Sequence, residues 1–392
     1  MMMDRKLLAL LLSLAFLCTA CAPEDPPPET SSGETPPVTV TARELLFDEA
    51  EGGNLCLDVK NGQALFHDLS KEHPGNTSAR NTIRLDLATG ERQELGFWSR
   101  YVRWDGGETY YWVGMTGPVT RHGEGSFGIG GGPQSNTWQE WVQEGIWRGN
   151  AQGEGDILYL LPVGEEREII SLELQGSCLS WAERVRSSLG VVFHVLDLES
   201  GELRTWEEKD TYHWWVDGGC LFSLDSRNIL RAEELATGEQ IFDRWVEEGT
   251  TRAFCDGGRI IWNEGAGRFH VYDCQTEKTR DLTDPGASEK ETAWELELLR
   301  GRYLAYRVVE PILLEDAPDI HRGLRVFDLE TGEVIYRSED DPAVAKRENW
   351  YYNQMMADRE GDMVLLAGAE HEVPDYWAMT GKEALSVFAL AG

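Results

Sequence analysis

The stretch FDLETGEVIY, residues 327–336, has the pattern of a strand, a tight turn and a second strand. Close copies occur as LDLATGE at 85–91, LDLESGE at 196–202 and EELATGE at 233–239. In this phrase the aspartate can accept hydrogen bonds from the amides of the turn, and the glycine can adopt the positive φ that other residues adopt at a cost. The recurrence predicts one strand–turn–strand unit that is repeated along the chain.

The spacing of these turns indicates the size of the repeat. Residues 164, 201 and 238 are each 37 positions apart, and we take about 37 residues as the period. A second phrase, an apolar run broken by a glycine turn, precedes each one, as in WDGGETYYW at 104–112. The aligned turn positions are Gly90, Gly164, Gly201, Gly238, Glu277, Gly332 and the terminal Gly392.

Four short antiparallel strands in about 40 residues are typical of a β-propeller blade. Seven such units predict an all-β fold, a single seven-bladed β-propeller of four-stranded antiparallel blades over residues 43–392. Strands such as ILYLL at 157–161 are apolar on both faces, as expected of blades packed between two neighbours. The last unit ends after its third strand, so we expect the N-terminal segment RELLFD, 43–48, to close the last blade as its outer strand.

The D-x-x-T-G turn resembles the turn of the YVTN and pyrroloquinoline-quinone-type propeller repeats, and the resemblance covers about residues 44–392. It implies the architecture and not an activity. The quinone-type repeat carries a tryptophan four positions after the turn glycine, whereas this chain has Glu94, Phe242 and Tyr336 there. We therefore expect no cofactor.

The N-terminus resembles a bacterial lipoprotein signal. Arg5 and Lys6 precede an apolar run over 7–17, too short to span a membrane, and Cys18-Thr19-Ala20-Cys21 follows. The resemblance implies removal of residues 1–20 and lipid attachment at Cys21; an ordinary secretory peptide with a soluble product is the alternative. Residues 21–42 are rich in Pro, Glu, Ser and Thr and predict an extended tether. The protein is then extracytoplasmic and lipid-anchored to the bacterial cell membrane.

Composition excludes several classes of partner. The formal net charge of −33 would repel nucleic acid, and it leaves the lipid anchor as the only membrane contact that we expect. The five cysteines after residue 43 are odd in number and share no CxxC spacing, which favours buried free thiols over a disulfide framework or a zinc site. We expect a monomer without a bound metal.

Long connections between the second and third strands distinguish four blades: 68–80 in blade one, 114–153 in blade two, 310–322 in blade six and 368–382 in blade seven. Ring closure would bring these blades together, so the connections would share one arc of one face. The sequence WQEWVQEGIW, 138–147, predicts a short helix with three tryptophans on one side. Candidate binding residues in this arc are Trp138, Trp141, Trp147, Asp316, Asp319, His321, His371, Asp375, Tyr376 and Trp377.

These observations favour a non-enzymatic propeller that binds a protein or glycan partner in the cell envelope through this arc. No HExxH, GxSxG or Walker motif is present, and GEGSFG at 123–128 lacks the βαβ context of a dinucleotide site. One alternative is a carbohydrate-active hydrolase or lyase that uses carboxylates of the same arc. Another is a scaffold in envelope assembly, similar to propeller lipoproteins that help insert outer-membrane proteins.

Overall fold

The computed structural model describes most of the body of the chain, and every structural statement below concerns that part. The described residues are 38–47, 54–73, 76–116, 119–125, 134–140, 143–162, 167–185, 191–207, 211–265, 267–288, 291–310, 320–341, 350–371 and 379–391. Residues 39–391 form one compact unit.

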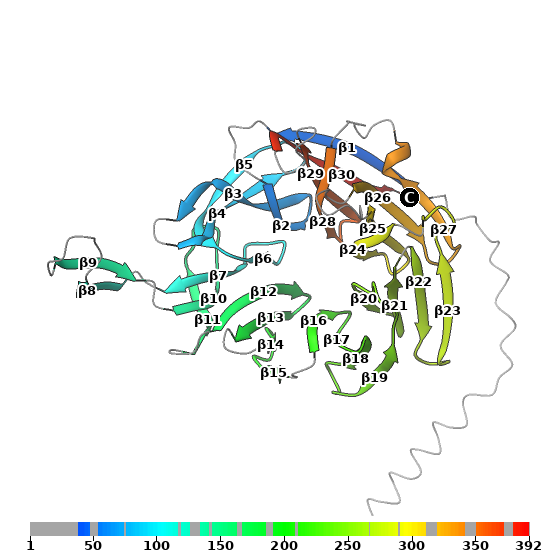
Figure 1. Cartoon of the computed structure of the whole chain (residues 1–392), viewed down its shortest axis with the longest axis horizontal. Helices are drawn as coiled ribbons and strands as arrows, with labels where there is room; N and C mark the ends of the chain where they lie inside the picture. Colours follow the sequence, from blue (N-terminus) through cyan, green and yellow to red (C-terminus); the bar gives the residue numbers. More distant parts are fainter. Residues whose placement is uncertain are drawn as a thin grey trace, which may run out of the picture. The chain divides into compact units, whose positions relative to one another are not determined.

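The unit is a seven-bladed β-propeller, as the repeat predicts (Figure 1). Each blade is a four-stranded antiparallel sheet that runs from an inner first strand to an outer fourth strand. Blades one to three are β2 (Asn54–Lys60), β3 (Gln63–His73), β4 (Asn76–Asp86) and β5 (Arg92–Ser99); β6 (Val102–Trp104), β7 (Tyr110–Thr116), β10 (Gln143–Gly149) and β11 (Gly155–Leu160); and β12 (Arg167–Gln175), β13 (Cys178–Val185), β14 (Val191–Asp197) and β15 (Leu203–Glu207).

Blades four to seven are β16 (Thr211–Asp217), β17 (Cys220–Asp225), β18 (Ile229–Glu234) and β19 (Gln240–Trp245); β20 (Ala253–Asp256), β21 (Arg259–Glu264), β22 (Arg268–Asp273) and β23 (Lys278–Thr283); β24 (Thr292–Leu299), β25 (Tyr303–Glu310), β26 (Ile320–Asp328) and β27 (Glu333–Arg337); and β28 (Trp350–Asp358), β29 (Met363–His371), β30 (Met379–Ala391) and β1 (Thr39–Phe47). The only helical element in the described residues is the single 3-10 turn η2 (Ser338–Asp340).

The repeated turn forms as its chemistry predicts. In blade one, Asp86 Oδ1 accepts hydrogen bonds from the amides of Ala88 and Thr89 at 2.9 and 2.8 Å, and Gly90 has a φ of +76°. These amide bonds, that of Thr89 foremost, lower the pKa of Asp86. Blade five confirms the predicted alignment at the one aligned turn position that is not a glycine. There Glu277 takes the place of the glycine and has a φ of +55°.

Apolar side chains from both faces of the sheets form the core between neighbouring blades. Blades one and two share a cluster that includes Trp104 and Trp112, and blades four and five share one that includes Phe222 and Trp262. A cluster with Val59 and Leu365 joins blade one to blade seven. The core is therefore a circle of interfaces, and blade seven contacts blade one as ring closure requires.

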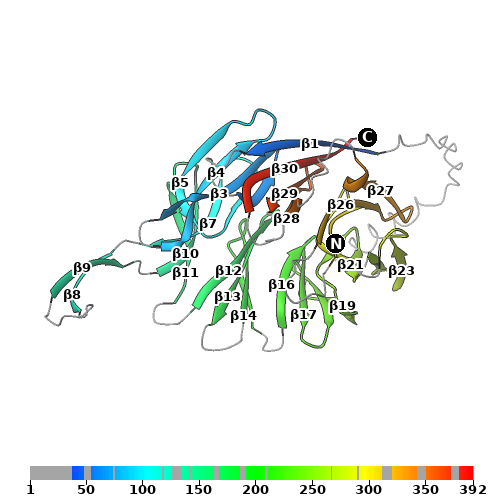
Figure 2. The same ribbon diagram turned by 45° about the horizontal axis from the view of Figure 1, so that its top comes forward.

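The N-terminal strand closes the last blade, which confirms the prediction. β1 pairs antiparallel with β30 from Thr39 opposite Ala391 to Phe47 opposite Glu383 (Figure 2). The strand begins at Thr39, so residues 39–42 belong to the propeller and not to the predicted tether over 21–42. Residues 39–47, TVTARELLF, are rich in the β-branched and apolar residues that favour strands, which explains the earlier start.

Blade two departs from the predicted alignment. Its third-to-fourth-strand turn lies at residues 150–154, where Asn150 Oδ1 accepts hydrogen bonds from Gln152 and Glu154 and Gly153 has a φ of +79°. Residues 157–160 therefore follow this turn in the outer strand β11, and the aligned position 164 lies outside the described residues. Asparagine replaces the expected aspartate of the repeated phrase, which explains why the sequence pattern does not identify this turn.

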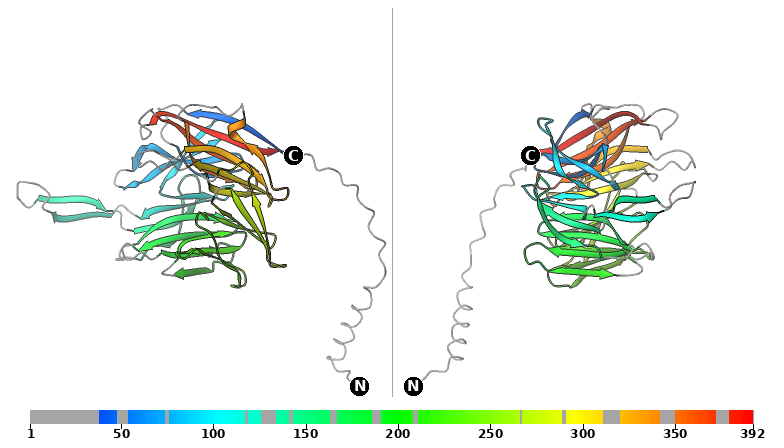
Figure 3. Two further views of the ribbon diagram at one scale, coloured as in Figure 1. Left: turned by 45° about the vertical axis from the view of Figure 1, so that its right-hand side comes forward. Right: turned by 90° about the vertical axis from the view of Figure 1, so that its left-hand side faces the viewer.

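The predicted insertion over 114–153 is accordingly shorter. β7 continues to Thr116, and β10 begins at Gln143. Between them, β8 (Val119–Gly125) and β9 (Gln134–Glu140) form a separate two-stranded antiparallel sheet that projects from the blade (Figures 1 and 3). The helix expected over 138–147 is wrong, since β9 and β10 occupy most of this stretch.

Candidate functional site: the central channel and the arc of long connections

Four of the ten predicted binding residues lie in described strands, and six lie outside the described residues. Trp138 lies in β9, Trp147 in β10, His321 in β26 and His371 in β29. His321 stands opposite Val309, and His371 opposite Met379, near the ends of their strand pairs. The lipid-attachment residue Cys21 lies outside the described residues. So do the other six binding candidates, which are Trp141, Asp316, Asp319, Asp375, Tyr376 and Trp377.

Trp147 is part of the core packing of blade two. It stands opposite Trp112 across the β10–β7 pair, and the two rings stack with centroids 6.2 Å apart. Trp112 in turn stacks on Phe97 of blade one at 4.3 Å. This cross-strand aromatic pair stabilises the sheet and its interface with blade one.

The described parts of the four long connections can be placed with respect to the ring. In blades one, six and seven, the second strands end at His73, Glu310 and His371 respectively. Blade two carries the β8–β9 pair at the corresponding place. Because blade seven packs against blade one, these four blades form one continuous arc (Figure 1).

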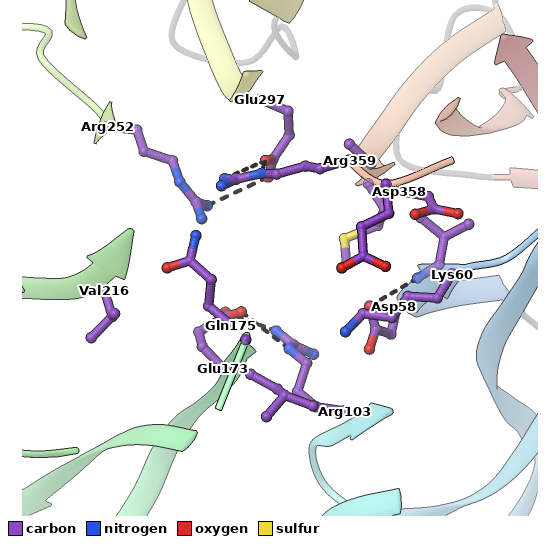
Figure 4. Close-up of a pocket in the computed structure, with 16 residues that line it drawn as sticks. Asp58, Lys60, Arg103, Glu173, Gln175, Val216, Arg252, Glu297, Asp358 and Arg359 are labelled. Atoms are coloured by element: carbon purple, nitrogen blue, oxygen red, sulfur yellow. Dashed lines mark hydrogen bonds and ion pairs between the residues drawn. The ribbon is translucent and has the colours of Figure 1, made fainter. Parts of the chain in front are cut away.

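The described residues also form a second site, which the sequence does not predict, in the channel along the propeller axis. Inner strands of several blades place charged side chains there (Figure 4). Arg103 of β6 donates to both carboxylate oxygens of Glu173 on β12, at 3.1 and 2.7 Å. It also donates to the carbonyl of Leu57 at 2.7 Å. Arg103 thereby links blades one, two and three.

Arg359 makes a similar link across the channel. Its guanidinium donates to Glu297 of β24 at 2.9 and 2.8 Å and to Asp217 of β16 at 2.5 Å. Asp217 also accepts from Gln175 Nε2 at 3.1 Å and from the amide of Cys255 at 3.3 Å. Burial by itself would lower the pKa of Arg359, but the two carboxylates raise it. Arg359 is thus a fixed cation whose charge is shared by Glu297 and Asp217.

Buried carboxylates of the inner strands tie neighbouring blades together. Asp58 of β2 accepts hydrogen bonds from its neighbour Val59 and from the amide of Trp104 in blade two, at 2.9 and 3.0 Å. Burial raises the pKa of Asp58 against the opposing effect of Arg103. Asp358 of blade seven accepts from the amide of Asn61 in blade one at 2.6 Å. These contacts hold the ring together at its inner edge.

The channel contains two hollows that meet at Glu173 and Arg252. One, of about 160 Å³, lies among the charged residues of Figure 4 and next to the first-to-second-strand turns. The other, of about 580 Å³, is bounded by blades three to six. Its lining residues are Ile170, Ser171, Glu173, Ala182, Val191, Phe193, His213, Trp214, Trp215, Thr251, Arg252, Glu295 and Leu296.

Two further kinds of feature are absent from the described part of the chain. It contains no group of three or more His, Cys, Asp or Glu side chains placed to hold a metal ion. It contains no helix long and apolar enough to cross a membrane. Cys178, Cys220, Cys255 and Cys274 are free thiols; Cys220 is buried as expected, whereas the other three are half-buried.

A lone charged residue on an otherwise apolar inner strand could have identified the channel. Arg103, between Val102 and Trp104 in YVRWD, shows this pattern, whereas Arg359 lies between Asp358 and Glu360, directly after β28. The first strand of a blade faces the axis, so such a charge needs a partner from another blade. The spacing of the repeat does not show which carboxylate supplies it.

Comparisons with known proteins support the fold alone. No protein-family model matches the chain, and no curated protein matches it. Among solved structures, the Cps50 (Swd1) β-propeller domain of Myceliophteria thermophila superposes with a TM-score of 0.50 and 10% identity, over 91% of this chain and 100% of that chain. This likeness agrees with the seven sheets described above.

Two further solved structures have a TM-score of 0.49. One is a chain of the mitotic checkpoint complex, with 11% identity over 95% of this chain and 99% of that chain. The other comes from a structural and mechanistic analysis of two prolyl endopeptidases, with 10% identity over 83% of this chain and 46% of that chain.

Proposed function

We propose that this protein is a membrane-anchored, extracytoplasmic binding propeller that captures a protein or glycan partner through the arc formed by blades six, seven, one and two. The observation that carries the proposal is the closure of the ring, which makes blades seven and one neighbours. The long connections of the four blades then belong to one continuous surface. Blades three, four and five have short connections between their second and third strands. The residues that the fold itself does not require are therefore concentrated in this arc.

The β8–β9 pair is the part of this arc best suited to a first test. Its two strands pair with each other from Val119 opposite Glu140 to Gly125 opposite Gln134 and belong to no blade sheet. An isolated two-stranded hairpin is marginally stable in water. Contact with a partner would supply the apolar surface that such a pair needs.

The arc is tested by site-specific photo-crosslinking in cells. A photoreactive residue at Thr137 in β9 should form a covalent adduct with the partner. The same residue at Glu199, in the turn before β15 on the opposite side of the blades, should not. Equal adducts from both positions, or adducts from Glu199 alone, would contradict binding through the arc.

The proposed anchor is tested separately from the arc. The pattern Cys18-Thr19-Ala20-Cys21 after an apolar run supports lipid attachment at Cys21. The change Cys21→Ala should release the protein from the membrane fraction, while Cys18→Ala should leave it bound. Membrane retention of the Cys21→Ala protein in cell fractionation would remove the anchor from the proposal.

A further inference from the structure

The larger hollow of the channel has the composition of a small-molecule site. Its volume of about 580 Å³ falls within the range of about 300–1,000 Å³ that is usual for ligand pockets. Three aromatic side chains line it, and two of them, Phe193 and Trp214, stack with centroids 5.9 Å apart. Ile170, Val191 and Leu296 add aliphatic wall. A planar apolar group would be enclosed by such walls.

The carboxylates that line or border the hollow already have cationic partners. Glu173 is held by Arg103 through two hydrogen bonds. Glu295 accepts from Arg307 Nε at 2.6 Å and from the amide of Met355 at 2.8 Å. Glu297 receives two hydrogen bonds from Arg359.

Arg252 has the longest carboxylate contact of these cations. It shares Glu297 with Arg359: Arg252 Nη1 lies 3.7 Å from Oε1, whereas Arg359 donates to Oε2. Arg252 Nε is buried and has no hydrogen-bond partner among the described residues. The guanidinium lies over the ring of Phe254 at 5.9 Å, and Figure 4 shows it reaching toward the centre of the channel.

Trp214 contributes a second unused donor. The residue is only 8% exposed, and within the described structure its Nε1 has no hydrogen-bond acceptor. By contrast, Nε1 of the adjacent Trp215 donates to the carbonyl of Ala253 at 2.8 Å. A buried donor without an acceptor is costly, which favours a ligand that supplies one.

Arg252 also acts on two ionisable side chains that line the hollow. Burial by itself would raise the pKa of Glu173, yet Arg103, Arg252 and Arg359 together lower it. Burial and the field of Arg252 lower the pKa of His213, another residue of the lining. Arg252 therefore exerts a positive field on both Glu173 and His213.

We propose that this hollow binds a small aromatic carboxylate, with the carboxylate on Arg252 and Trp214 Nε1 and the ring against the aromatic wall that Phe193 and Trp214 form. The site is separate from the arc and does not depend on the proposed partner. An aromatic carboxylate matches the two unused donors and the aromatic walls together. A neutral ring would leave the donors unpaired, and inorganic phosphate would leave the walls in contact with water.

The proposal is tested with the full-length protein and 2-naphthoate as the probe, by titration calorimetry. We expect saturable one-to-one binding. The matched neutral probe, 2-naphthamide, should bind at least about tenfold more weakly, because it cannot form charge-assisted hydrogen bonds. Failure of 2-naphthoate to bind, or equal binding of the two probes, would overturn the proposal without any variant.

Two variants locate the site. Arg252→Gln should weaken 2-naphthoate binding by about tenfold or more, and Trp214→Phe, which keeps a ring, should weaken it several-fold. Arg244→Gln is the matched control, since Arg244 lies over the ring of Tyr272 at 4.4 Å and does not line the hollow. Unchanged affinity in Trp214→Phe and in any folded Arg252→Gln protein, or an equal loss in the control, would place the carboxylate elsewhere.

Discussion

Glu183 of blade three is a fully buried carboxylate held by a histidine, a tryptophan and an arginine. His194 Nε2 lies 3.1 Å from its Oε1, Trp181 Nε1 donates to the same oxygen at 3.3 Å, and Arg167 lies 3.2 Å from Oε2. Burial raises the pKa of Glu183, but the contacts with His194, Tyr159 and Trp181 outweigh it and hold the pKa at about 2. The carboxylate is therefore charged in the folded protein at neutral pH.

The same arrangement recurs in blade five. Trp262 and Glu264 take the places of Trp181 and Glu183, and His270 stacks on Trp262 with centroids 4.9 Å apart. His270 Nε2 lies 3.0 Å from Glu264. The tryptophan, histidine and outer-strand partner stand in register across three strands in both blades. In both blades the histidine is thus packed between a tryptophan and the outer strand, beside a carboxylate.

A prediction at this scale concerns acid stability. The change Glu183→Gln should lower the free energy of unfolding at pH 7 by about 1–3 kcal/mol, because it removes a charge-assisted buried network. The folded pKa lies below the ordinary 4.5, so the stabilisation by Glu183 is complete above pH 4.5 and is lost as the pH falls toward 2. Urea unfolding from pH 7 to 3 should show the two proteins converging in stability.

The matched control is Glu199→Gln, a change in the exposed turn before β15. It should leave the unfolding midpoint nearly unchanged at every pH. A difference between wild type and Glu183→Gln that stays constant down to pH 3 would show that the charge of Glu183 is not what stabilises blade three.

At the scale of the element, the turn between the third and fourth strands of blades one to six determines how well the sequence predicts the strands of each blade. Where the phrase is D-x-x-T-G or close to it, the pattern places the flanking strands correctly. Blade two uses Asn150 and Gly153 instead, and the pattern misplaces its outer two strands. Trp138, Trp141 and Trp147 have helical spacing, but pairing with β7 places Trp147 in a strand, since tertiary contacts outweigh local periodicity.

The turn also supports a prediction. Gly201 has a φ of +74°, and a Cβ placed there would meet no atom within 4 Å, so only backbone strain opposes substitution. Gly201→Ala should reduce the free energy of unfolding by about 1 kcal/mol, and Gly201→Asn by less, because asparagine tolerates this conformation. Urea unfolding of both variants is the measurement. An alanine variant as stable as wild type would show that the positive φ is not required.

At the scale of the whole molecule, the sequence predicts the number of blades, their strand order and the closing strand, because each follows from local turns and from the count of units. The channel is not predictable in this way, because its ion pairs join inner strands from different blades. Arg103 pairs with Glu173, 70 residues away, and Arg359 with Asp217, 142 residues away. No local pattern encodes such partners.

Ring closure is the claim on which the proposed arc depends, and hydrogen exchange at β1 measures it most directly. In the closed ring, β1 pairs with β30 along its whole length, so about half of the amides of Thr39–Phe47 should exchange slowly in the native protein. Mass spectrometry of peptides covering these residues gives the rates. Slow exchange that is lost only on unfolding is the predicted result; exchange of all these amides at unfolded-chain rates would contradict closure and remove the basis of the arc.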